Sequence, residues 1–134
     1  MKLFCSYAYT GEDVAIVTAR MRKVVDALTE QGNEVYCPLF DELVAPLEAA
    51  NDVKAIFTHA FDGIKRQEAM VVIISSERRS EGQLMEIGAA LSEKKPVYLF
   101  QHQTAVATSY LPKLVTKTYV WNSESDLLSS LKKI

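Results

Sequence analysis

The sequence contains few of the residues on which disulfide-rich and metal-binding proteins depend. Among its 134 residues are two cysteines, two histidines, five glycines and four prolines. Two cysteines cannot build a disulfide framework, and no set of histidines and cysteines has metal-ligand spacing. Neither common glycine-rich phosphate loop is present. We therefore expect no metal and no cofactor, and we expect Cys5 and Cys37 to be reduced, buried residues at the ends of strands.

The sequence also lacks a surplus of one charge and any long apolar segment. Fifteen Lys and Arg against 17 Asp and Glu give a formal net charge of -2. Without a basic block, neither nucleic acid nor an anionic membrane is an expected partner. The longest apolar run is about one strand long, far below the roughly 20 residues that span a bilayer, and the N-terminus lacks a signal-like apolar core. These absences favour a cytoplasmic protein with a single domain over residues 1–134.

What the sequence has is an alternation of strand-like and helix-like segments. Apolar residues recur at helical spacing from Val14 to Leu28. They do so again from Val53 to Ile64, within a single helical stretch predicted to follow Pro46 and to run to about Glu68. Strands are predicted at residues 2–6, 34–37, 69–74, 96–100 and 118–121, and a last helix at 125–132. Repeated strand–helix units with short joins predict an α/β fold with a five-stranded parallel sheet and helices on both faces.

The most informative segment is residues 80–90, which read Ser-Glu-Gly-Gln-Leu-Met-Glu-Ile-Gly-Ala-Ala. It follows the apolar run 69–74, so a helix beginning here starts beyond the carboxyl end of a buried strand, where open α/β sheets bind ligands. The helical neighbours of Glu86 are small or uncharged: Gly82, Gln83, Ala89 and Ala90. A ligand can therefore approach the carboxylate. The alternative is a surface helix with Ser80 as N-cap and Gln83 completing a capping box.

The pattern Ser80-x-Gly82-x-x-x-Glu86-x-Gly88-x-Ala90 resembles the signature of the nucleoside 2-deoxyribosyltransferase family, which includes deoxynucleoside 5′-monophosphate N-glycosidases. Three weaker blocks fit in the same order: Leu3-Phe4-Cys5, Tyr36-x-Pro38-Leu39 and Asp62-Gly63-Ile64-Lys65. The resemblance implies a flavodoxin-like, doubly wound sheet and a nucleoside or nucleotide substrate whose N-glycosidic bond is hydrolysed or exchanged, with hydrolysis preferred. It implies a homodimer or larger homo-oligomer with shared sites. It also implies that Glu86 is the nucleophile, forming a covalent glycosyl intermediate.

The departing base needs a proton or a hydrogen bond, so a second acidic residue is expected. Counting back from Glu86 without gaps places Asp62 where the monophosphate hydrolases have their aspartate, and Ala60 where the transferases have theirs. Asp62 is thus the candidate acid, although the apolar stripe of this helix favours Ala60 as the inward-facing residue. If Asp62 is only solvated, either the acid comes from Asp41, Glu42 or His59, or activity is weak or absent.

Several further residues are expected to bind the substrate. By resemblance, Ser80 matches the signature serine, whose hydroxyl and neighbouring helix amides would hold a phosphate, and Ser109 falls near a serine contributed by a neighbouring subunit. By the same resemblance, the first loop of the monophosphate hydrolases carries a serine and an arginine. Residues 6–11 here have hydroxyls but no arginine, so Arg78 and Arg79 either supply the positive charge or are a solvated pair in their own loop. The expected substrate-binding set is Ser6, Tyr7, Tyr9, Asp41, Glu42, Ser80, Gly82 and Ser109.

Two other functions stay open. Phe4-Cys5-Ser6-Tyr7 followed by Glu12-Asp13 also resembles the opening of a TIR-like domain, whose members hydrolyse NAD through a glutamate or act as signalling adaptors. A catalytically silent nucleotide-binding sensor that has lost the aspartate is the third possibility. Release of free base from nucleosides, monophosphates or NAD separates these functions.

Overall fold

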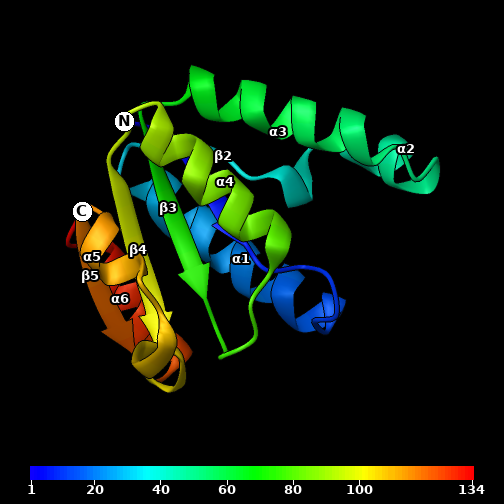
Figure 1. Cartoon of the computed structure of the whole chain (residues 1–134). Coiled ribbons are helices and arrows are strands. Elements are labelled where there is room, and N and C mark those ends of the chain that lie inside the picture. The colour runs from blue at the N-terminus through cyan, green and yellow to red at the C-terminus, as the bar shows by residue number, and fades with distance from the viewer.

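The chain folds into one parallel five-stranded sheet with the strand order β2-β1-β3-β4-β5 (Figure 1). The computed structural model describes residues 1–105 and 109–134 in full and the backbone alone of 106–108. The strands are β1 (Lys2–Tyr7), β2 (Glu34–Tyr36), β3 (Ala69–Ile74), β4 (Val97–His102) and β5 (Lys117–Trp121). All four neighbouring pairs are parallel. This is the strand order of flavodoxin-like folds, so the predicted fold class is confirmed.

Helices cover both faces of the sheet (Figure 1). They are α1 (Val14–Glu30), α2 (Val44–Ala49), α3 (Val53–Arg66), α4 (Glu81–Ser92), α5 (Leu111–Leu114) and α6 (Glu124–Leu131), with 3-10 turns η1 (Pro38–Phe40) and η2 (Gln103–Thr108). The single helical stretch predicted before β3 is two helices. The chain breaks it where Asn51 takes a positive φ of 52° and Asp52 caps α3 by accepting a hydrogen bond from the Ala55 amide.

Each face of the sheet has its own apolar core. Alternate side chains of β3 point to opposite faces, because successive residues of a strand do so. Val71 and Ile73 pack with α1 and α6, whereas Met70 and Val72 pack with α3, α4 and α5. β3 is therefore buried on both sides, as its unbroken apolar sequence predicts. Its carboxyl end is where the loop to α4 begins, so this central strand sets the position of α4.

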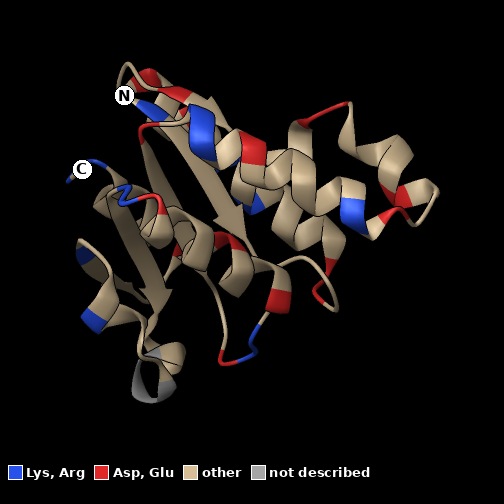
Figure 2. Cartoon of the chain, turned by 45° about the horizontal axis from the view of Figure 1, so that its top comes forward, with Lys and Arg blue, Asp and Glu red and all other residues tan. Residues whose placement is uncertain are grey.

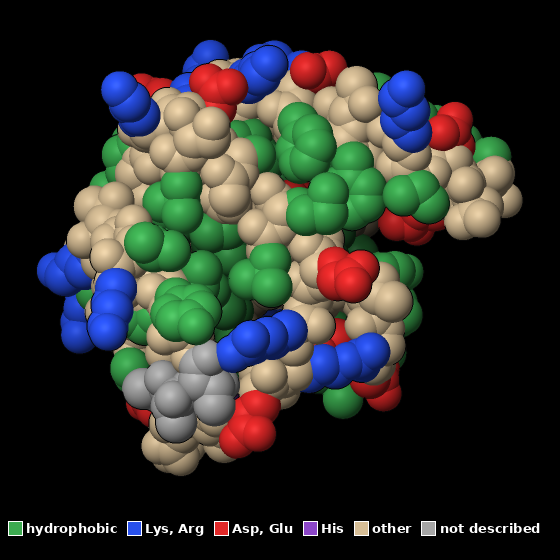
Figure 3. Space-filling model, in the orientation of Figure 1, with side chains coloured by type: hydrophobic (Ala, Val, Ile, Leu, Met, Phe, Trp, Pro, Cys, Tyr) green, Lys and Arg blue, Asp and Glu red, His purple; other side chains and the backbone are tan. Residues whose placement is uncertain are grey.

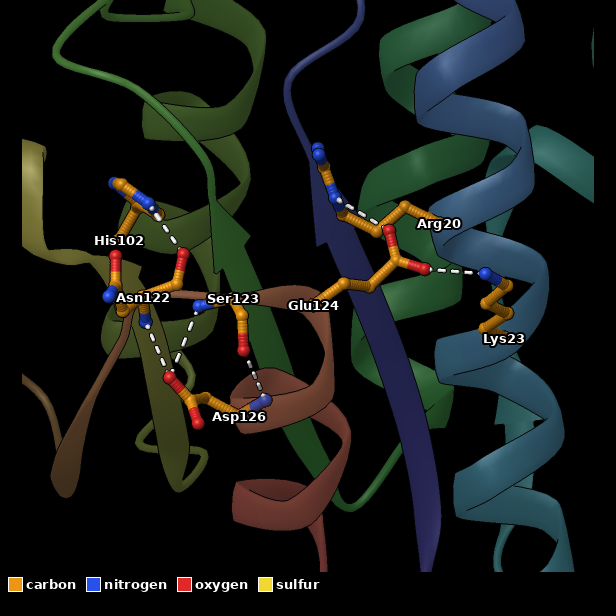
Figure 4. Close-up of polar contacts among 7 residues, drawn as sticks. All are labelled: Arg20, Lys23, His102, Asn122, Ser123, Glu124 and Asp126. Carbon is orange, nitrogen blue, oxygen red and sulfur yellow. Dashed lines mark hydrogen bonds and ion pairs between the residues drawn. The ribbon is translucent and has the colours of Figure 1, made fainter.

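Polar contacts fix α6 against α1 on the face remote from α4 (Figure 4). Ser123 and Asp126 form a reciprocal capping box at the start of α6. Glu124, in the first turn, accepts a hydrogen bond from Lys23 Nζ of α1 at 2.7 Å and lies 3.9 Å from Arg20 Nε. These contacts hold the first turn of the last helix against α1.

Acidic and basic residues are interspersed along the chain rather than gathered in one block (Figure 2). The loop between β3 and α4 carries an acidic residue followed by two basic ones, Glu77, Arg78 and Arg79. Among the described residues, no helix combines the length and the hydropathy needed to cross a bilayer.

Candidate functional site

A cleft of about 960 Å³ lies at the carboxyl ends of β1 and β2. The α2–α3 arm forms one wall and the first turns of α4, with the loop before them, form the other. Part of the opening is seen beneath the α2–α3 arm in Figure 3. This is the edge where open α/β sheets bind ligands, because loops leave the strands there and helix N-termini point toward it.

Glu86 enters the cleft from the second turn of α4. Its Oε1 accepts a hydrogen bond of 2.9 Å from the hydroxyl of Ser6, a fully buried residue of β1. Burial raises the pKa of the Glu86 carboxyl to about 7, against the opposing effect of the Ser6 hydrogen bond. The carboxyl group therefore changes its ionisation near neutral pH, as a group poised for acid–base or nucleophilic work would.

The start of α4 is fixed to the sheet by two residues of the signature segment. Ser80 is the N-cap, and its hydroxyl accepts a hydrogen bond of 3.3 Å from the Gln83 amide. The predicted capping box is wrong, because the Gln83 side chain does not return to the cap. It is buried and donates instead to the Ile73 carbonyl at 2.9 Å. This bond holds the first turn of α4 at the end of β3.

Gly82 brings α4 close to α3. A Cβ added at Gly82 would lie 3.4 Å from the ring of Phe57, which also lines the cleft. A larger side chain at this position would fill the space beside Glu86, one turn further along the helix. Gly82 thus lines the cleft and leaves space beside Glu86.

The first loop receives an arginine from elsewhere in the chain. Gly11 has a φ of +77°, and a Cβ at this position would overlap the guanidinium of Arg78. Arg78 therefore reaches from the β3–α4 loop to the backbone of the first loop. Tyr7 and Tyr9 line the cleft beside it, with their rings edge to face and centroids 6.3 Å apart. Sequence order alone could not indicate this loop crossing.

The structure does not bring Asp62 to Glu86. Asp62 is exposed on α3 and lies outside the cleft lining, whereas Ala60 is buried and lines the cleft. The reason is helical geometry, since two positions along a helix rotate a side chain by about 200°. The cleft wall therefore has an alanine at the position that the resemblance assigns to the transferases' aspartate.

Asp41 is joined to two residues of the cleft wall. Its Oδ2 accepts a hydrogen bond of 2.5 Å from the Tyr36 hydroxyl and lies 2.7 Å from His59 Nε2. Burial acts to raise the pKa of Asp41, but the hydrogen bonds from His59, Tyr36 and the Leu43 amide outweigh burial and hold this pKa below its usual 3.8. Tyr36 and His59 line the cleft, whereas Asp41 stands behind them.

Two predicted binding residues lie elsewhere. Glu42 is exposed and outside the cleft lining. Ser109 lines a separate pocket of about 180 Å³ on the other side of the β3–α4 loop, where its hydroxyl accepts from the Leu111 amide at 3.1 Å. Gln101 also lines this pocket, and its buried amide has no hydrogen-bond partner among the described residues. Ser80 lies on the wall between the two cavities.

The cleft also contains residues that sequence reasoning missed. Glu48 and Asn51 line it from the end of α2, and Thr10 lines it from the first loop. The break between α2 and α3, which puts Glu48 and Asn51 at the rim, has no clear apolar signal in the sequence. Among the described residues, no three His, Cys, Asp or Glu side chains gather as a metal site would require. Cys5 and Cys37 are free and buried, and burial raises both thiol pKa values, that of Cys37 to about 12.

Solved structures of known proteins share the fold of this chain. A search of proteins with curated functions finds no match. The CMP N-glycosidase BcmB of Clostridium botulinum has a similar solved structure, with a TM-score of 0.68 and 18% identity, covering 98% of this chain and 99% of that one. The 2-deoxyribosyltransferase of Bacillus psychrosaccharolyticus gives a TM-score of 0.66 at 18% identity, covering 98% and 96% of the two chains.

A third similar structure, the Flv1 flavodiiron core of Synechocystis, is matched over 36% of its length with a TM-score of 0.54 and 10% identity, covering 99% of this chain. At these identities the structural matches show the shared fold. The family model for nucleoside 2-deoxyribosyltransferases matches residues 11–125, which include most of the cleft wall. The chain belongs to the nucleoside 2-deoxyribosyltransferase family.

Proposed function

We propose that the protein cleaves the N-glycosidic bond of a nucleoside or nucleoside 5′-monophosphate, with Glu86 as the nucleophile. The observation that carries the proposal is the Glu86 carboxylate, held by Ser6 at 2.9 Å inside the cleft of a family member. Hydrolysis is preferred over base exchange. Tyr7 and Tyr9 line the same cleft and offer ring faces and hydroxyls to the substrate.

The proposed reaction has two steps, as in retaining glycosidases. First, a Glu86 oxygen forms a bond to the anomeric carbon while the bond from that carbon to the base nitrogen breaks, and its electron pair leaves with the base. Because Ser6 contacts Oε1, Oε2 is the oxygen free of that contact to attack. Water then hydrolyses the glycosyl ester and restores the Glu86 carboxylate.

A phosphate subsite would favour the 5′-monophosphate. Arg78 and Ser80 both line the cleft, and the amides at the start of α4 follow Ser80 directly. A guanidinium, a hydroxyl and helix N-terminal amides are groups that bind phosphate. Replacing Arg78 by Gln should raise KM for a monophosphate and leave KM for the matching nucleoside unchanged. Equal effects on both substrates would contradict the subsite.

We also propose that the protein assembles as a homodimer or larger homo-oligomer. Apolar side chains gather over α3, α4 and α5 on the face drawn in Figure 3. Four large exposed ones are Leu84, Met85, Tyr110 and Leu114. A second copy of the chain would cover these side chains. Sedimentation velocity of wild type and Leu84→Glu tests this, and two monomeric proteins would contradict it.

The test of the function is release of free base from a panel of nucleosides, nucleoside 5′-monophosphates and NAD, followed by chromatography. Wild type should release base from one of the first two groups, and Glu86→Gln should release none. Release from NAD alone would favour the TIR-like alternative. Tight binding of a nucleotide without release by wild type would favour the silent sensor. Undiminished release by Glu86→Gln would remove Glu86 as the nucleophile.

A further inference from the structure

We propose that His59, held by Asp41 and Tyr36, donates the proton to the departing base in place of the aspartate that is absent at position 60. This inference rests on the proposed function, because it concerns the leaving group of the same reaction. Three observations carry it. The imidazole of His59 lies in the wall of the cleft that contains Glu86, the carboxylate of Asp41 lies behind that imidazole, and the neighbouring residue Ala60 has no acidic group.

The hydrogen bonds define the orientation of the imidazole. An ionised carboxylate only accepts hydrogen bonds, so Tyr36 Oη and His59 Nε2 both donate to Asp41 Oδ2. His59 Nε2 therefore carries a hydrogen, which leaves Nδ1 as the ring nitrogen that exchanges a proton with a ligand. The Tyr36 ring packs edge to face on the imidazole, with centroids 6.4 Å apart, and limits its rotation.

The carboxylate of Asp41 lies behind the imidazole of His59. The three hydrogen bonds that Asp41 accepts keep it ionised at neutral pH, and its Oδ2 lies 2.7 Å from His59 Nε2, so that an ionised carboxylate holds the ring from behind. Leu43 completes this set, since its amide donates to the other Asp41 oxygen at 2.9 Å. Asp41 and Tyr36 are positioning residues, and His59 is the group that faces the cleft.

Glu48 is the competing proton donor in the cleft wall. It is exposed at the end of α2, and none of the described residues forms a side-chain hydrogen bond or ion pair with it. An exposed carboxylate that no neighbour holds does not keep the fixed geometry that a proton donor needs. His59 is half-buried and held from one side, so it meets the geometric requirement better.

Both steps need only the substrate, water and the side chains of Glu86 and His59. As the Glu86 oxygen bonds to the anomeric carbon, the electron pair of the broken bond stays on the base nitrogen, which takes the Nδ1 proton of His59. The neutral imidazole then accepts a proton from the attacking water while the glycosyl ester of Glu86 opens. Sugar and free base are the products, and both side chains return to their starting states.

The test compares two leaving groups on one sugar. The first substrate is the natural nucleoside or monophosphate, and the second is the 4-nitrophenyl glycoside of the same sugar, whose leaving group departs without a proton. For His59→Gln, kcat/KM on the natural substrate should fall by about 10²- to 10⁴-fold, with less than about a threefold loss on the nitrophenyl substrate. Glu86→Gln should lose both activities.

The matched control is the other histidine of the chain, His102, which contacts Thr104 and the Asn122 carbonyl at the ends of β4 and β5. His102→Gln should leave both activities unchanged. Tyr36→Phe removes one hydroxyl and keeps the ring, so it should give a smaller loss restricted to the natural substrate. If His59→Gln does not fold, Tyr36→Phe tests the role of His59 instead.

Each other outcome overturns the inference and can be told apart from failure of the proposed function. Equal losses on both substrates would make His59 a structural residue, and no loss on either would remove it from the reaction. A loss restricted to the natural substrate in Glu48→Gln, without one in His59→Gln, would assign the proton to Glu48. In these cases the function stands if Glu86→Gln is inactive. No base release by wild type would overturn both.

Discussion

Replacing Glu86 by Gln should make the folded protein more stable at neutral and alkaline pH. The substitution keeps the shape and the half-buried position of the side chain and removes its charge. Burial raises the pKa of Glu86 from 4.5 to about 7, and a rise of this size corresponds to about 3 kcal/mol of unfavourable free energy for the ionised form. Glutamine avoids this term.

The direction in which the free energy of unfolding changes with pH follows from the proton that Glu86 binds. Between about pH 4.5 and 7 the folded chain holds a proton on Glu86 that the unfolded chain has released. The free energy of unfolding of wild type should therefore fall across this range by up to about 3 kcal/mol relative to the variant, and the difference should stay constant above it. Below about pH 4.5 the protonated carboxyl resembles the amide and the difference should vanish.

Urea unfolding followed by circular dichroism, at intervals from pH 4 to 8.5, measures this difference. Exposed Glu42 offers a matched control, because Glu42→Gln also removes one negative charge but outside the cleft. Parallel profiles of wild type and Glu86→Gln would refute the reasoning, because they would mean that the Glu86 carboxyl is as well solvated in the folded chain as in the unfolded one.

Four other substitutions test further contacts of the structure. Ser6→Ala removes the hydrogen bond to Glu86, so the acid limb of the kcat/KM profile should move to higher pH; an unmoved limb would contradict this. An added Cβ at Gly88 of α4 would meet no atom within 4 Å, so Gly88→Ala should raise the free energy of unfolding by about 1 kcal/mol. At Gly63 the added Cβ would lie 3.2 Å from the Tyr36 ring, so Gly63→Ala should not raise it in the same urea titration. Ser123→Ala removes the N-cap of α6 and should cost about 1 kcal/mol, seen as a lower Tm.

The fold could be predicted from the sequence because its strands and helices carry strong local patterns. The apolar run of β3 is buried on both faces, and the spacing from Val14 to Leu28 is that of a helix with one buried stripe. The break at Asn51 could not be predicted in the same way, because a positive φ at one asparagine leaves the apolar spacing around it unchanged.

The site was harder to predict, because it depends on which way the helices turn their side chains and on contacts between loops that are far apart in the sequence. Glu86 was accessible to reasoning, since its helical neighbours are within four positions. Asp62 and Ala60 are two positions apart, and only the orientation of α3 decides that Ala60 faces the cleft. Arg78 reaches the first loop across more than sixty positions of sequence. No local pattern contains that contact.

The environment that disfavours the ionised form of Glu86 in the free protein also favours the proposed reaction. A carboxylate removed from water interacts more strongly with a nearby positive charge, because the effective dielectric constant around it is lower. In the proposed reaction that positive charge develops on the sugar only as the bond to the base breaks. The unfavourable burial of Glu86 is then offset in the transition state and not before, which is the condition for raising a rate rather than tightening binding. A variant that relieves the burial should therefore gain stability and lose activity together.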